Sequence, residues 1–74
     1  MNTIEEEKLE DLLEDCIDKY GVSNVLEHLA FVLYGKADHI QDSYGDSGLA
    51  RQWKSAGKKA EAFSQTPLIK AISI

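Results

Sequence analysis

The sequence is short of the residues that give small domains covalent support or reactive chemistry. Its 74 residues include one cysteine, one proline and two histidines. Cys16 has no partner for an internal disulfide bond. Its neighbours Asp15 and Asp18 oppose the electropositive setting that activates a catalytic thiol. We therefore expect Cys16 to be a buried, reduced thiol on an apolar helix face, with no role in catalysis.

Long apolar segments are missing as well. No run of 18 or more apolar residues is present, so we expect no membrane-spanning helix and no membrane partner. The first seven residues carry three glutamates and lack the basic and then apolar pattern of a secretory signal peptide. With a single cysteine, this favours a cytoplasmic protein.

The usual signatures of catalysis and of cofactor binding are not found either. There is no glycine-rich phosphate loop, no pair of carboxylates in a credible cleft and no Ser–His–Asp arrangement. His28 and His39 are eleven residues apart, about 16 Å along a helix, so they cannot share one metal ion within the chain. We therefore expect a protein that is not an enzyme and that binds neither a metal nor a cofactor.

Helical periodicity dominates what is present. Apolar residues recur at three- and four-residue steps, which predicts helices over about 4–20, 24–44 and 48–64. Gly21 is placed to end the first helix, and Asp46 or Ser47 to cap the third. Thr66 and Pro67 suit the start of a short fourth helix over 67–72. The predicted fold is all-α, a single domain over 1–74, built as a small three-helix bundle with room for this short C-terminal helix.

The second helix carries the apolar stripe around which we expect the core to form. Ser23 is its natural N-cap, and the short connection before it predicts that the first two helices are antiparallel neighbours. We expect Leu29 and Trp53 to be buried against each other's helices. The stripe consists of Val22, Val25, Leu26, Leu29, Val32, Leu33 and Ile40.

Phe31 lies on the opposite side of this helix, roughly 160° from Leu29 at about 100° per residue. One core cannot reach both side chains, so we expect Phe31 to be covered by a second subunit or by the apolar C-terminal tail. Glycine inside a helix often marks close approach of another backbone, and Gly35 lies on the same helix. The predicted partner interface consists of Phe31, Tyr34, Gly35, His28 and His39.

Charge is distributed unevenly along the chain, whose net charge is −5. Residues 1–20 carry eight acids and two lysines, whereas residues 51–74 carry five basic residues and one acid. The acidic face of the first helix includes Glu7, Glu10 and Glu14. The third helix presents a basic stripe of Arg51, Lys54 and Lys58. Such opposite regions attract each other, within one chain or between two.

One segment of the sequence resembles a known pattern. It reads Ala37-x-His39-Ile40-x-x-x-Tyr44-x-Asp46-x-x-Leu49-Ala50-Arg51-x-Trp53-x-x-Ala56. This is similar to a pattern in a family of small, uncharacterised bacterial helical proteins, and the likeness covers roughly residues 18 to 62. The chain departs from that pattern in its Ser43-Tyr44-Gly45 turn and in its apolar C-terminal tail. The resemblance implies a compact helical fold and carries no activity.

Together these features predict a small protein–protein interaction module that self-associates, as a homodimer, or binds another protein. Direct nucleic-acid binding is not expected, because three or four basic residues give only modest attraction and the rest of the chain repels phosphate. Two alternatives stay open at this point. One is an acidic inhibitor that mimics nucleic-acid phosphates on a partner protein, and the other is a small regulatory subunit of a larger enzyme.

Overall fold

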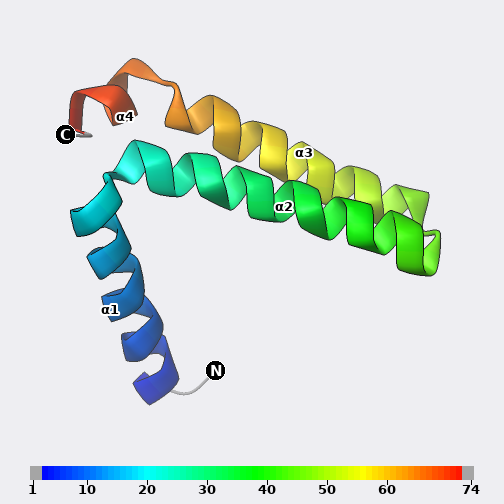
Figure 1. Ribbon diagram of the computed structural model, residues 1–74, viewed down its shortest axis with the longest axis horizontal. Coiled ribbons are helices and arrows are strands. Elements are labelled where there is room, and N and C mark those ends of the chain that lie inside the picture. Colours follow the sequence, from blue (N-terminus) through cyan, green and yellow to red (C-terminus); the bar gives the residue numbers. More distant parts are fainter. Residues whose placement is uncertain (1–2, 73–74) are drawn as a thin grey trace.

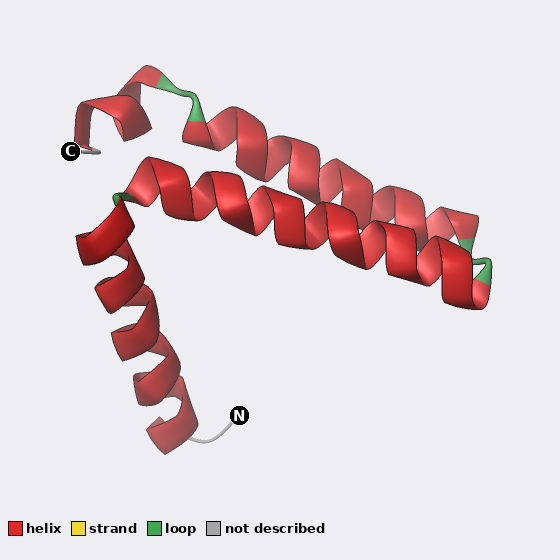
Figure 2. Ribbon diagram, in the orientation of Figure 1, coloured by secondary structure: helices red, strands yellow, loops and turns green. Residues whose placement is uncertain are grey.

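The computed structural model describes residues 3–72, which form four helices and no strand (Figures 1 and 2). The predicted all-α class with a short fourth helix at the C-terminus is confirmed. The helices are α1 (Thr3–Tyr20), α2 (Val22–Tyr44), α3 (Ser47–Ser64) and α4 (Pro67–Ile72).

Two glycines with positive φ end the first two helices. Gly21 has φ 83°, and its N–H donates to the carbonyl oxygen of Ile17 at 2.8 Å. Gly45 has φ 65°, and its N–H donates to Gln41 O at 3.0 Å. These conformations strain any side chain, so glycine is the residue that allows each helix to stop there.

Side-chain oxygens cap the two later helices. Asp46 accepts a hydrogen bond from the backbone N–H of Leu49 at 3.0 Å, and Thr66 Oγ1 accepts one from Ile69 N at 3.4 Å, with Pro67 as the first residue of α4. The prediction of Ser23 as a cap for α2 is wrong. The helix begins at Val22, two residues before the predicted start, so Ser23 lies inside it, and its hydroxyl donates to the carbonyl oxygen of Ser64 at 3.0 Å.

Helices α2 and α3 form an antiparallel hairpin and lie side by side over most of their length (Figure 1). Small residues, spaced seven apart on each helix, line the contact. This spacing keeps them on one side of a helix, and their size lets the two backbones approach closely. We call this contact the small-residue seam; it pairs Ser23, Ala30 and Ala37 of α2 with Ser64, Gly57 and Ala50 of α3.

The seam is tight at its centre. A Cβ atom added to Gly57 would lie 2.7 Å from Cε1 of Tyr34 and 3.2 Å from the carbonyl oxygen of Ala30. Ala30 and Ser64 are completely buried. Close backbone approach therefore occurs at Gly57 and not at Gly35, where an added Cβ would meet nothing within 4 Å.

The large apolar residues predicted as the core do not fill this seam. Leu29 is 45% exposed, so the expected burial of Leu29 and Trp53 against each other's helices is wrong for Leu29; Trp53 is half-buried. The physical reason is angular. Leu29 stands about 100° around α2 from Ala30, the residue that actually faces α3.

Helix α1 leaves the hairpin at a steep angle and packs beside α2 only near the Gly21 corner (Figure 1). The predicted antiparallel packing of the first two helices is therefore wrong. The cause is the connection, which is the single residue Gly21. Antiparallel helix pairs need connecting loops of about two to five residues.

Helix α4 lies at the other end of the hairpin from the α2–α3 turn and packs on both long helices. Ile69 is buried there, with 4% of its surface exposed. Ile69 thus packs the C-terminal helix against its own chain, whereas Leu68 and Ile72 stay exposed.

The resulting single chain is open. Its radius of gyration is 14.4 Å, whereas a compact domain of this length has about 11 Å. Its extents are 39 × 34 × 15 Å, so it is little more than one helix thick. The chain exposes 5694 Å², compared with roughly 4,500 Å² for a folded monomer of its mass.

Within residues 3–72, no helix combines the length and the apolar character needed to cross a membrane.

Candidate protein-interaction surface

The α2–α3 hairpin presents a broad apolar face beside the seam. On each helix, large apolar side chains lie about a quarter-turn from the small residues of the seam. Because the two helices run antiparallel, these two rows point to the same side of the hairpin. We call this surface the hairpin face; it consists of Leu26, Leu29, Leu33 and Ile40 of α2 with Leu49, Trp53, Ala56, Ala60 and Phe63 of α3.

Much of the hairpin face is exposed to solvent in the described chain. Leu49 is 41% exposed and Phe63 47%, in addition to Leu29, while Leu33 and Trp53 are half-buried. The face contains a shallow depression of about 300 Å³, lined by Leu49, Gln52, Trp53 and Ala56. Contiguous exposed apolar surface of this kind marks interaction sites in soluble proteins.

A second uncovered apolar surface runs along α1. We call it the α1 stripe; it consists of Leu9, Leu12, Leu13, Cys16, Ile17 and Tyr20. Leu12 is 60% and Tyr20 62% exposed, and Leu9, Leu13 and Ile17 are also exposed. Cys16 is a free thiol and is half-buried, so the expected full burial is not found within one chain.

Most of the predicted interface residues lie exposed on the side of α2 away from the hairpin face. Phe31 is 50% exposed, and its ring stands edge-on to that of His28 with 5.6 Å between the centroids. Helix α4 packs on the hairpin, yet half of the Phe31 surface stays exposed, so the described C-terminal helix leaves much of Phe31 uncovered. Coverage of Phe31 by a second subunit stays a prediction.

Tyr34 lies at the contact between α2 and α3 and is partly exposed. Its ring lies over Gly57, and its hydroxyl donates to Oε2 of Glu61 at 2.9 Å. Desolvation first, and then the hydrogen bond and the negative charge of Glu61, raise the pKa of Tyr34 above its ordinary value. The residue thus ties α2 to α3.

His39 makes only local contacts at the far end of α2. Its Nδ1 lies 3.4 Å from Oγ of Ser43, and its ring stands edge-on to that of Tyr44. His39 is exposed, as a residue of the predicted partner interface would be in a single chain. Across residues 3–72 the structure brings together no group of three His, Cys, Asp or Glu side chains suited to a metal ion.

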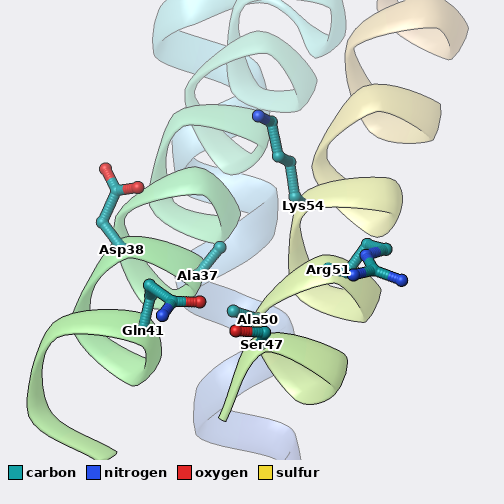
Figure 3. Close-up of a pocket in the computed structure, with 7 residues that line it drawn as sticks. All are labelled: Ala37, Asp38, Gln41, Ser47, Ala50, Arg51 and Lys54. Atoms are coloured by element: carbon teal, nitrogen blue, oxygen red, sulfur yellow. The ribbon is translucent and has the colours of Figure 1, made fainter. Parts of the chain in front are cut away.

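The basic stripe lies on the polar side of the hairpin, opposite the hairpin face. Arg51 and Lys54 line a depression of about 400 Å³ between α2 and α3, together with Asp38, Gln41 and Ser47. Figure 3 shows Gln41 pointing toward α3 and Arg51 pointing away from α2. Lys58 lines a neighbouring depression with Tyr34. Acidic and basic groups are mixed here, so this surface does not form a site for a single type of charge.

Helix α1 carries the acidic face. Glu7, Glu10 and Glu14 are exposed, and the helix that bears them stands clear of the rest of the chain (Figure 1). Both the acidic face and the α1 stripe are therefore open to a partner along most of the helix.

The sequence contained a signal for the seam that periodicity of large apolar residues did not reveal. The small residues Ser23, Ala30 and Ala37 repeat every seven positions, and so do Ala50, Gly57 and Ser64. Two matching repeats of this kind indicate a close contact between the two helices, and the short turn between them makes that contact antiparallel. The large apolar residues are then left for another contact.

Comparison of the chain with family models, with curated proteins and with solved structures gave no match.

Proposed function

We propose that this protein is a self-associating protein–protein interaction module of the reducing cytoplasm, without catalytic activity. The observation that supports the proposal is the pair of uncovered apolar surfaces, the hairpin face and the α1 stripe. The chain exposes about 1,200 Å² more than a compact monomer of its mass, and a partner could bury this additional surface. Stable protein interfaces bury about 800 Å² on each partner, which this excess would supply.

A second copy of the chain is the partner we favour. Both apolar surfaces belong to every molecule, so a homodimer can satisfy each of them with no other component. Small domains commonly gain the stability they lack from association. Cys16, a lone thiol on the α1 stripe, stays unpaired in a reducing compartment and does not oppose this contact.

Light scattering over a wide range of protein concentration tests the proposal. We expect a mass of twice the 8.2 kDa of one chain at high concentration, falling toward the single-chain mass on dilution. A single-chain mass at every concentration would contradict self-association.

The acidic inhibitor is the second candidate, and the exposed position of the α1 acids favours it. A mimic of nucleic-acid phosphates depends on its carboxylates, so replacing Glu7, Glu10 and Glu14 with glutamine should abolish capture of the partner protein. Self-association through apolar surface should change little, since exposed ion pairs contribute only about 0–1 kcal/mol each. Scattering and partner binding of the triple variant are measured together, and unchanged partner binding would exclude mimicry.

A further inference from the structure

Helix α1 cannot cover the hairpin face of its own chain. To lie along that face it would have to run about 8–10 Å from α2 or α3 and reverse direction at its end. Such a reversal needs about two to five connecting residues. Only Gly21 lies between Tyr20 and Val22, and its backbone holds α1 away from the hairpin. Closing the chain on itself would require part of α1 or α2 to unwind.

The two uncovered surfaces nevertheless match in length. Helices α1 and α3 have 18 residues each, about 27 Å along the axis. Leu9, Leu13, Cys16 and Tyr20 are spaced +4, +3 and +4, and this spacing forms a straight seam on a helix. The shallow middle of the hairpin face, at Ala56 and Ala60, leaves room for a third helix.

Their charges also match. Helix α1 carries eight acids and two lysines. At about 100° per residue, Lys36 of α2 and Lys59 of α3 border the outer edges of the hairpin face, and both are exposed. An α1 helix placed on this face brings acids toward those lysines. Two hairpin faces placed against each other would bring the same lysines together.

We propose that the hairpin face is the docking site for α1 of a second copy of the chain, so that two chains exchange their first helices. Each hairpin then becomes a three-helix bundle completed by its partner, and both apolar surfaces are covered at once. This inference rests on the proposed self-association and specifies its geometry. It also explains how a chain with so few large buried residues can be stable.

Cross-linking from the single native cysteine tests the exchange. Three hairpin-face variants are made in a Cys16→Ser background, each is mixed with the wild-type chain, and the mixture is treated with a short bismaleimide. The substitutions are Gln52→Cys, Ala56→Cys and Ala60→Cys, one helical turn apart. We expect a covalent heterodimer between Cys16 of the wild-type chain and at least one of these variants.

Matched controls place the new cysteine on the polar side of α3, at Lys54→Cys and Lys58→Cys in the same background. Both native side chains are exposed, and circular dichroism checks that every variant stays helical. We expect at least tenfold less heterodimer with the controls. Equal yields on both sides of α3 would overturn the proposed site.

The remaining outcomes separate the geometry from self-association itself. Dimers in which Ala56→Cys chains link to each other but not to Cys16 would show hairpin faces in contact. That result would overturn the exchange and retain the dimer. A single-chain mass in light scattering, with no heterodimer, would overturn both.

Discussion

At the scale of single residues, two glycines in helices of the same hairpin have opposite surroundings. Gly57 lies in the small-residue seam, where an added Cβ would meet the Tyr34 ring and the Ala30 carbonyl oxygen. Gly35 lies on the open side of α2, where an added Cβ would meet nothing within 4 Å. Helix propensity alone favours alanine at both sites by about 1 kcal/mol. The difference between the two substitutions therefore isolates packing in the seam.

We predict that Gly57→Ala destabilises the protein and Gly35→Ala stabilises it. Overpacking typically costs about 1–3 kcal/mol, which at Gly57 exceeds the gain in propensity. At Gly35 the gain of about 0.5–1 kcal/mol is unopposed. Thermal unfolding at one protein concentration measures both effects, and each kcal/mol of stability shifts the melting temperature by about 4–8 °C. Equal stabilisation by both substitutions would contradict the seam, and a loss at Gly35 would show that a partner covers that side.

The hydrogen bond from Tyr34 to Glu61 makes a pH-dependent contribution. Because the pKa of Tyr34 is raised in the folded chain, folding favours the neutral hydroxyl. Its contribution is complete below the unfolded value of about 10 and is lost as pH rises through the higher folded value. We expect phenolate absorption of the folded protein to show one of its three tyrosines titrating late, and Tyr34→Phe to remove that step.

Glu61→Gln provides the control for this assignment. It keeps an oxygen that can accept the Tyr34 hydrogen bond and removes the negative charge, so the late step should move to lower pH. A late step that survives Tyr34→Phe would belong to Tyr20 or Tyr44 and would contradict the assignment.

At the scale of helices, the ends could be predicted from the sequence and the packing could not. Helix ends depend on local backbone contacts, so they can be predicted from neighbouring residues. This holds for Gly21, Asp46 and the Thr66–Pro67 pair. Which side of α2 faces α3 depends on two helices at once. Large apolar residues such as Leu29 were assigned to that contact because their burial is favourable. Burial of a large apolar side chain is favourable against any partner, within the chain or outside it. In this chain the close contact between α2 and α3 is made by small residues such as Ala30.

The candidate interaction surface shows the same limit. Phe31 was singled out because it stood apart from the predicted core, but that argument assumed that Leu29 was covered. The structure leaves Leu29 and Phe31 similarly exposed, at 45% and 50%, on nearly opposite sides of one helix. Sequence periodicity indicated two sides to α2 and could not indicate that both would be open.

We predict that Leu29→Ser weakens self-association at least tenfold, or about 1.4 kcal/mol, because Leu29 lies in the hairpin face. Phe31→Ser should weaken it less, since Phe31 lies on the side of α2 away from that face. Sedimentation equilibrium gives both dissociation constants, and helix content measured by circular dichroism serves as the folding control. A larger effect at Phe31 would move the interface to the opposite side of α2.

At the scale of the whole molecule, the short connection at Gly21 decides whether the chain can complete its own core. Three helices with matching apolar surfaces would ordinarily close into one bundle. The single-residue connection opposes that closure, whereas the exchange of α1 that we propose would cover both surfaces. Short connections are known to favour such exchange, and lengthening them favours the closed monomer.

We therefore predict that inserting Gly-Ser-Gly-Ser between Gly21 and Val22 converts the dimer into a monomer. The longer connection lets α1 reach its own hairpin face, and the intramolecular contact then outcompetes the second chain at ordinary concentrations because its effective concentration is in the millimolar range. Light scattering should report the mass of one chain, and the emission of Trp53 should keep the wavelength it has in the dimer, because the face stays covered.

The same four residues inserted between Gly45 and Asp46 lengthen the α2–α3 turn without affecting α1, and that variant should still form a dimer. If the Gly21 insertion leaves a dimer of unchanged affinity, the connection does not control association and α1 is not the exchanged element.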